Sequence, residues 1–146
     1  MVTISTPEAM FELGRNIGSR LRAGDVLVLN GPLGAGKTLL TQGIGGALGI
    51  AGITSPTFVI SKIHKGKIPL IHVDAYRLMQ SENPIFSLDD LDLDSERENA
   101  ITVIEWGGDL ASRLSEERLE IFIDRTNEVR QVNAIGHGAR WENFSL

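Results

Sequence analysis

The sequence predicts an α/β fold with a mostly parallel central sheet, and three consecutive segments carry that prediction. Residues 26–29 form a short apolar run, Val-Leu-Val-Leu, of the kind found in buried parallel strands. A glycine-rich loop follows, and residues 38–48 then show a helical pattern that closes at Gly49. We therefore expect a three-layer sandwich of helices around the sheet, with an antiparallel extension from later strands.

The loop between that strand and helix matches a phosphate-binding pattern. Residues 31–38 fit G-x-x-x-x-G-K-[ST] at every fixed position. Glycines let the backbone approach closely and point its N–H groups at phosphate oxygens, at the positive end of the following helix. Lys37 would reach the β- and γ-phosphates, and the Thr38 hydroxyl would take one magnesium position. The sequence thus predicts a P-loop NTPase-like fold that binds a nucleoside triphosphate with Mg²⁺.

Composition limits the remaining possibilities. With 146 residues and 42% hydrophobic content, the chain is the size of one domain, which we assign to residues 1–146. It has no cysteine, so disulfides, thiolate metal sites and cysteine nucleophiles are excluded. Its formal charge of −5 argues against a surface built to grip nucleic acid and favours a protein partner. No apolar run is long enough for a membrane span, and we expect a cytoplasmic protein without membrane contact.

The rest of the chain offers further helix and strand signals. Ser5 and Glu8 have the spacing of a capping box, which predicts a helix running to about Arg22 and ended by Gly24. Alternation and β-branched content predict strands at 57–64 and 68–74. Lys65-Gly66-Lys67 between them indicates a hairpin or a short excursion between the strands. The same signals predict a buried strand centred on 103–104 and a closing strand pair at 118–124 and 128–135.

Two acids are candidates for the metal side of a phosphate site. Glu105 ends the apolar run 101–105, where this fold places a carboxylate that holds magnesium directly or through water. The alternative is an ordinary exposed acid at a strand end. Asp74 and His72 alternate with apolar residues, so they share one face of a predicted strand, and Asp74 would orient water or coordinate metal. Alternatively, Asp74 caps the next segment and His72 is a buried histidine with satisfied hydrogen bonds.

Two further segments have both a functional and a structural interpretation. Thr57, within Ser55-Pro56-Thr57-Phe58, lies where a switch segment would sense the γ-phosphate, although an ordinary loop-to-strand junction would look the same. Residues 82–98 hold seven acids and one arginine. This acidic segment is either a solvated face or a docking surface for a basic partner.

Five motifs in this order resemble the TsaE family, a small bacterial ATPase needed to make threonylcarbamoyladenosine in transfer RNA. The resemblance covers most of the chain, and its later motifs are more specific than the phosphate loop. They are Gly24-Asp25, Leu33-Gly34-Ala35-Gly36-Lys37-Thr38, Ser55-Pro56-Thr57-Phe58, His72-Val73-Asp74-Ala75-Tyr76-Arg77-Leu78 and Ile104-Glu105-Trp106.

The resemblance implies a set of roles at matching positions. It implies that Lys37, Asp74 and Glu105 serve hydrolysis, and that Thr38 and Glu105 hold Mg²⁺. The nucleotide contacts would be made by Gly34, Ala35, Gly36, Lys37, Thr38, Leu39, Thr57 and Trp106. It also implies a partner, the TsaB–TsaD pair that transfers the threonylcarbamoyl group, with ATP hydrolysis supporting repeated cycles.

Other classes of phosphate-loop protein remain as alternatives. A small-molecule kinase would need an arginine-bearing lid, and the spacing of Arg97, Arg113 and Arg118 makes no paired lid motif. A nucleotide-sensing interaction module with incidental turnover overlaps with the TsaE interpretation. Comparing basal with partner-stimulated hydrolysis separates the two.

Overall fold

The described elements form one mixed sheet with two α-helices. The computed structural model describes residues 1–32, 34–53, 61–74, 98–105, 116–125 and 127–146. The helices are α1 (Pro7–Gly18) and α2 (Lys37–Ala47), and a short 3₁₀ turn, η2, covers Ala139–Trp141. The strands are β1 (Val2–Ile4), β2 (Val26–Asn30), β3 (Ser61–His64), β4 (Leu70–Asp74), β5 (Ile101–Glu105), β6 (Arg118–Asp124) and β7 (Arg130–His137).

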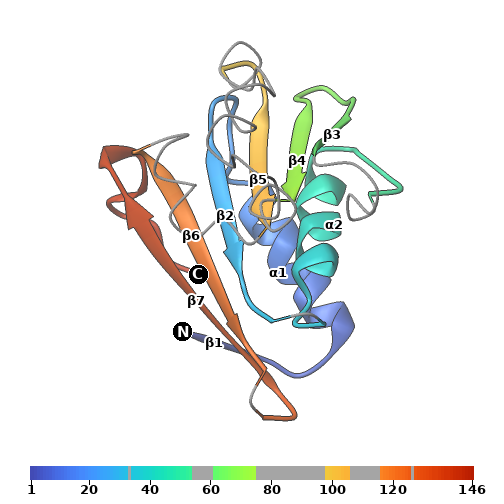
Figure 1. The fold of residues 1–146 in the computed structure, drawn as a ribbon, viewed down its shortest axis with the longest axis vertical. Helices are drawn as coiled ribbons and strands as arrows, with labels where there is room; N and C mark the ends of the chain where they lie inside the picture. Colours follow the sequence, from blue (N-terminus) through green and yellow to red (C-terminus); the bar gives the residue numbers. More distant parts are fainter. Residues whose placement is uncertain (33, 54–60, 75–97, 106–115, 126) are drawn as a thin grey trace, which may run out of the picture.

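The sheet is parallel in its centre and antiparallel at both edges. Its strand order is β1-β7-β6-β2-β5-β4-β3 (Figure 1). β2 pairs in parallel with β5 and β6, and β4 pairs in parallel with β5. The β6–β7, β7–β1 and β3–β4 pairs are antiparallel. The α/β fold with a parallel centre is therefore confirmed, whereas antiparallel strands flank it on two sides rather than forming one extension.

Both faces of the central strands are buried. Leu27 and Leu29 of β2 belong to the same hydrophobic cluster as Ile17 of α1 and Leu40 of α2. The alternating residues Val26 and Val28 of β2, and Ile71, Val73 and Ile104 on the neighbouring strands, are also buried. A parallel sheet covered on both faces requires such continuous apolar strands. The two described helices pack against each other. A three-layer sandwich needs helices on both faces of the sheet, and that arrangement stays a prediction.

The first helix begins one residue later than the sequence suggested. The N-cap is Thr6, whose hydroxyl accepts a hydrogen bond from the Ala9 amide at 3.1 Å, with Pro7 in the first helical position. The capping box predicted from Ser5 is therefore wrong. The helix also ends at Gly18 rather than near Arg22, although Leu21 still packs into the core.

Glycines allow the two helices to touch backbone to backbone. A Cβ atom at Gly14 would collide with the carbonyl oxygen of Leu40, and one at Gly43 would collide with that of Phe11. At Gly18, a Cβ would lie 2.7 Å from the carbonyl oxygen of Ile44. This approach is possible only without side chains. It fixes α2, the helix that follows the phosphate loop, against α1 (Figure 1).

Most other predicted elements appear with shifted ends. The second helix spans Lys37–Ala47 and is closed by Gly49, whose φ is +74°. β3 and β4 form the predicted hairpin around residues 65–67, while positions 57–60 lie outside the described residues. The strand 118–124 is confirmed, and its partner runs from Arg130 to His137 rather than 128–135. β1 was not predicted, because three residues are too few to show a period.

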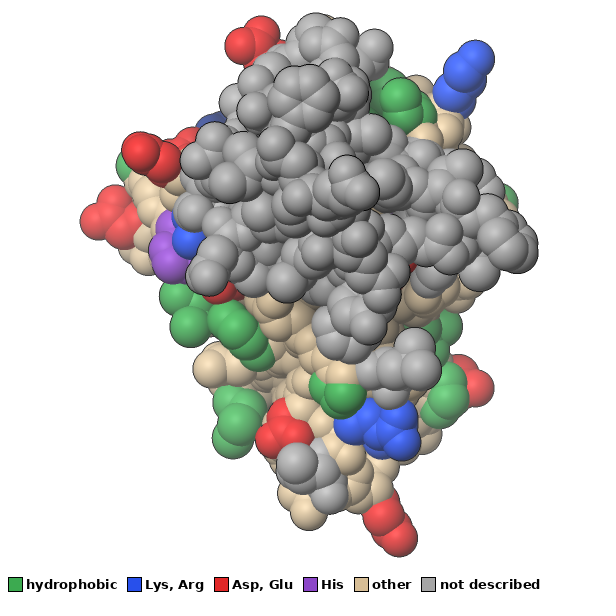
Figure 2. All heavy atoms as spheres, viewed as in Figure 1, with side chains coloured by type: hydrophobic (Ala, Val, Ile, Leu, Met, Phe, Trp, Pro, Cys, Tyr) green, Lys and Arg blue, Asp and Glu red, His purple; other side chains and the backbone are tan. Residues whose placement is uncertain are grey.

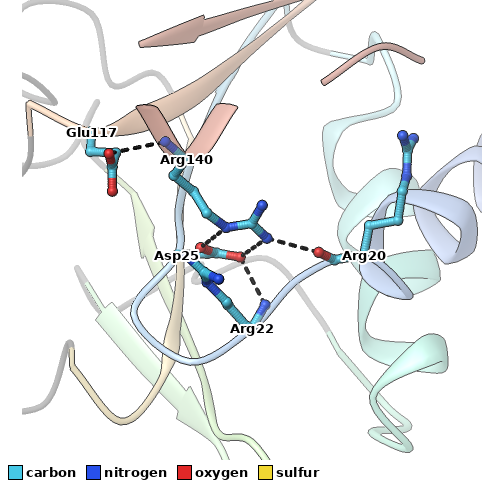
Figure 3. A network of polar contacts seen from close by, with 5 residues as sticks. All are labelled: Arg20, Arg22, Asp25, Glu117 and Arg140. Carbon is cyan, nitrogen blue, oxygen red and sulfur yellow. Dashed lines mark hydrogen bonds and ion pairs between the residues drawn. The ribbon is translucent and has the colours of Figure 1, made fainter. Parts of the chain in front are cut away.

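A polar network ties the C-terminal turn to the start of β2. The Arg140 guanidinium donates to both carboxylate oxygens of Asp25, each at 3.0 Å, and to the carbonyl of Arg20 at 2.9 Å (Figure 3). The backbone amide of Arg22 donates to Asp25 at 2.8 Å, and the amide of Arg140 donates to Glu117 at 3.1 Å. The Asp25–Arg140 ion pair holds η2 and the buried Trp141 against the sheet.

Among the helices of the described residues, none has the length and apolar character needed to cross a membrane.

Candidate nucleotide-binding site

The phosphate loop lies between the C-terminal end of β2 and the N-terminus of α2. Gly34 and Gly36 adopt φ values of +77° and +114°, a region that side-chain-bearing residues rarely enter. Gly36 is the N-cap, and the first helical hydrogen bond runs from the Leu40 amide to the Gly36 carbonyl at 2.9 Å. The helix thus begins at Lys37, and its N-terminal amides lie at the loop. Such a terminus favours an anion.

Lys37 is a buried cation folded back over its own loop. Its side chain is 6% exposed, and its ammonium donates to the carbonyls of Gly31 at 2.7 Å and Pro32 at 2.9 Å. Burial lowers the pKa of Lys37 from its ordinary 10.5, while the negative charges of Glu105 and Asp74 oppose that shift. The charges of Asp74 and Glu105 thus lie close enough to Lys37 to affect its protonation.

The two predicted acids lie side by side at the C-terminal ends of neighbouring strands. β4 and β5 are parallel, and their register pairs Asp74 with Glu105 at the last position of each strand. Glu105 is 5% exposed, so it is not an ordinary surface acid. Within the described part of the chain, its Oε1 atom has no hydrogen-bond partner. An unsatisfied buried carboxylate oxygen calls for an explanation, and a bound cation would supply one.

His72 lies two residues before Asp74 on β4 and therefore on the same face of the sheet as the two acids. It is fully buried, and its Nε2 atom lies 3.2 Å from Oε1 of Glu105. The contact has ion-pair distance but not hydrogen-bond geometry, and neither ring nitrogen has a hydrogen-bond partner among the described residues. His72 is therefore buried, as the alternative expects, but among the described residues it lacks the hydrogen bonds that the alternative requires.

Two arginines that sequence reasoning missed also reach the phosphate loop. A Cβ atom at Gly34 would lie 2.6 Å from Nη1 of Arg125, and Nη2 of Arg130 donates to the Gly34 carbonyl at 3.5 Å. Together with Lys37 they surround the loop with positive charge, an arrangement that suits a polyanion. Because β6 runs parallel to β2, the residue after β6 falls at the ligand-binding edge of the sheet. Recognising β6 as parallel would have singled out Arg125.

A cavity of about 300 Å³ opens beside the loop. Its walls come from the end of β1 and the start of α1 (residues 4–7 and Met10), the loop at 34–36, Leu39, and the start of β7 with Glu128 and Arg130. This volume lies at the lower end of the roughly 300–1,000 Å³ range of small-molecule pockets. The cavity has mixed polar and apolar walls and is continuous with the phosphate loop.

The oxygen donors at the site match the preferences of Mg²⁺. The Thr38 hydroxyl is on the first turn of α2, and the Glu105 carboxylate has its unsatisfied Oε1 atom. Mg²⁺ is a hard cation that takes oxygen ligands, commonly one or two carboxylates with waters and phosphates. No group of three or more His, Asp or Glu side chains with metal-site spacing occurs among the described residues.

Several predicted positions lie outside the described residues. These are Leu33, Thr57, Trp106 and residues 82–97 of the acidic segment. Of the predicted nucleotide contacts, Gly34, Ala35 and Gly36 form the described part of the loop, and Leu39 lines the cavity beside it.

Comparison with known proteins identifies the family of this chain. The sequence profile of "Threonylcarbamoyl adenosine biosynthesis protein TsaE" matches residues 4–132. The chain belongs to the TsaE family. It is 47% identical over 141 residues to a tRNA threonylcarbamoyladenosine biosynthesis protein TsaE from Streptomyces coelicolor, covering 90% of this chain and 93% of that protein.

Two more distant relatives extend the comparison. A protein of the same name from Bacillus subtilis is 36% identical over 140 residues, covering 93% of this chain and 85% of its own length. The crystal structure of Bacillus subtilis YdiB superposes with a TM-score of 0.76 at 31% identity, covering 97% of this chain and 87% of that one. The mixed seven-stranded fold is therefore shared with a solved structure.

Proposed function

We propose that this protein is the ATP-binding and ATP-hydrolysing subunit that supports threonylcarbamoyladenosine modification of tRNA together with TsaB and TsaD. We propose further that it is a P-loop NTPase of the three-layer type. One observation carries the proposal: Lys37 is buried at the head of a positive-φ glycine loop and is electrostatically coupled to Glu105 and Asp74. Cationic phosphate binders facing paired acids are the parts needed for Mg²⁺-assisted phosphoryl transfer.

Each residue of the site has a distinct role in this proposal. The amides at 34–38 and the Lys37 ammonium bind the phosphates, and Arg125 and Arg130 add positive charge from the side. Thr38 and Glu105 would hold Mg²⁺, which would supply charge neutralisation at the phosphoryl group. Asp74, paired with Glu105 across the sheet, orients the attacking water. Thr57 and Trp106 complete the proposed nucleotide contacts.

The cavity beside the loop is the proposed place for the base and ribose. Gly34 and Gly36 of the loop form part of the cavity wall, so a nucleoside bound there would have its phosphates at the N-terminus of α2. Met10 supplies an apolar wall, and Glu128 and Arg130 supply polar groups. Pockets of this composition fix orientation with a few polar groups and gain affinity from apolar surface.

Recognition of tRNA is assigned to the partners rather than to this chain. On the described part of the face in Figure 2, acidic side chains are scattered near the outline, and Lys and Arg side chains form a few separate groups. The formal charge of −5 agrees with that picture. Tight tRNA binding needs many cations to displace counterions. The protein is therefore proposed to act as a slow ATPase that TsaB–TsaD engages and stimulates.

The test is multiple-turnover tRNA modification with purified TsaB–TsaD. Lys37→Ala should weaken ATP binding about tenfold or more, because charge-assisted bonds to phosphate are lost. It should also abolish repeated turnover. Lys65→Ala, at an exposed lysine of the β3–β4 turn, is the matched control and should behave as wild type.

Three results would contradict the proposal. Full multiple-turnover modification with the folded Lys37→Ala protein would remove ATP from the mechanism. Tight tRNA binding by the isolated chain would contradict the assignment of recognition to the partners. Transfer of the γ-phosphate to a small-molecule acceptor rather than to water would favour the kinase alternative.

A further inference from the structure

We propose that His72 is a positioning residue that holds the Glu105 carboxylate for Mg²⁺ binding. The inference rests on the proposed function and adds a residue to it. It starts from the sheet register, in which His72 lies opposite Val103 and Asp74 lies opposite Glu105. His72 and Glu105 are therefore diagonal neighbours on one face of the β4–β5 pair.

The burial of His72 needs a compensating interaction. Its side chain is fully buried, and both ring nitrogens lack hydrogen-bond partners among the described residues. An unpaired buried polar group destabilises a fold, and an apolar side chain of similar size would avoid that cost. Glu105 Oε1 is equally unsatisfied and lies 3.2 Å from His72 Nε2. Each atom is the partner that the other lacks.

A small rotation turns this contact into a hydrogen bond. With its proton on Nε2, neutral His72 donates to Oε1 and fixes the orientation of the carboxylate. Hydrogen bonds at functional sites are often poorly aligned before the ligand binds and tighten afterwards. Ligating carboxylates are commonly held by such neighbours, whose loss reduces metal affinity or activity. His72 thus acts through Glu105 rather than on the nucleotide.

The experiment measures how Mg²⁺ affects nucleotide binding. A fluorescent ATP analogue is titrated against wild type, His72→Leu and His72→Gln over a Mg²⁺ series and with excess EDTA. Leu fills the space without a donor, whereas the Gln amide reaches about as far as Nε2. In His72→Leu the Mg²⁺ concentration for half-maximal binding should rise about tenfold. Affinity in EDTA should be unchanged, and His72→Gln should restore most of the Mg²⁺ response.

A matched control separates positioning from general damage to the sheet. Thr102 lies on β5 with a fully buried hydroxyl that also lacks a hydrogen bond among the described residues, but its side chain points to the opposite face. Thr102→Val should leave the Mg²⁺ response at the wild-type level. Adding His72→Leu to Glu105→Gln should not weaken the Mg²⁺ response further, because His72 acts through the Glu105 carboxylate.

The outcomes distinguish this inference from the proposed function. A folded His72→Leu protein with wild-type Mg²⁺ response overturns the positioning role alone. So does equal loss in His72→Leu and His72→Gln, or a matching loss in Thr102→Val. If His72→Leu does not fold, His72→Asn replaces it, since its shorter amide does not reach Oε1. Wild type without any Mg²⁺-dependent ATP binding overturns the proposed function and this inference together.

Discussion

Each end of the parallel strands at the centre of the sheet has a buried carboxylate, and the two differ in how many hydrogen bonds they accept. Asp25 before β2 and Glu105 at the end of β5 are each 5% exposed. Asp25 accepts three hydrogen bonds, two from Arg140 and one from the Arg22 amide. The Glu105 Oε1 atom accepts none among the described residues and shares its surroundings with Lys37 and His72.

We propose that this difference separates a structural site from the candidate functional site. At the Asp25 end, opposite charges neutralise each other within the fold, so that no ligand is needed. At the Glu105 end, acids and a cation from separate elements come together, and the Glu105 Oε1 atom has no hydrogen-bond partner among the described residues. Buried unsatisfied groups are rare in native proteins and concentrate where a ligand, ion or reaction uses them. Substitutions at the two ends should therefore affect different properties.

The largest expected effect is on stability at the Asp25 end. Arg140→Leu leaves the Asp25 carboxylate buried without its cation, which should lower the free energy of unfolding by about 3–5 kcal/mol. Urea denaturation measures this loss. The double variant Asp25→Asn with Arg140→Leu should recover part of it, because the uncompensated charge is gone. ATP affinity of the folded protein should stay unchanged, and a matching loss of ATP affinity would erase the distinction between the two ends.

The opposite result is expected at the Glu105 end. Glu105→Gln removes a buried charge, so the free energy of unfolding without nucleotide should stay the same or rise. Hydrolysis at saturating ATP and Mg²⁺ should slow about a hundredfold, since electrostatic stabilisation of the transition state is lost. Steady-state phosphate release measures the rate. Wild-type turnover in this variant would leave Glu105 as a structural acid.

Two glycines at opposite ends of α2 sharpen the comparison. Gly36 and Gly49 both have positive φ, so Gly36→Ala and Gly49→Ala should each cost about 1–2 kcal/mol of stability. No atom lies within 4 Å of a Cβ at Gly49, which makes it a control for backbone strain alone. ATP affinity should fall only in Gly36→Ala. Equal affinities in both variants would argue that the loop conformation does not matter for phosphate binding.

The smallest effect concerns pH. The pKa of Lys37 is lower in the folded protein than its ordinary 10.5, so the unfolded chain binds that proton more tightly. Stability without nucleotide should therefore rise with pH between the lowered pKa and 10.5. Urea denaturation across this window should show the rise in wild type and not in Lys37→Met. An identical pH dependence in both proteins would show that other groups cause it.

Local sequence patterns predicted much of the site. The loop 31–38 has a fixed spacing of glycines, lysine and threonine, and the acids Asp74 and Glu105 end apolar strands. Because parallel strands share one carboxyl edge, these positions had to meet once the strands were recognised. The N-cap at Thr6 was missed because Ser5 and Thr6 are both good capping residues, and the choice depends on where Pro7 begins the helix.

The sequence by itself determined the phosphate loop, the strands around it and the acids at their ends, because these follow from short-range spacing and periodicity. The tertiary structure alone decided that Arg140 neutralises Asp25, 115 residues away, and that Arg125 reaches Gly34. It also decided that His72 lies beside Glu105, since the register of two strands separated in the chain sets that contact. Charge pairing and register are properties of packed neighbours, and no local pattern encodes which distant residue becomes the neighbour.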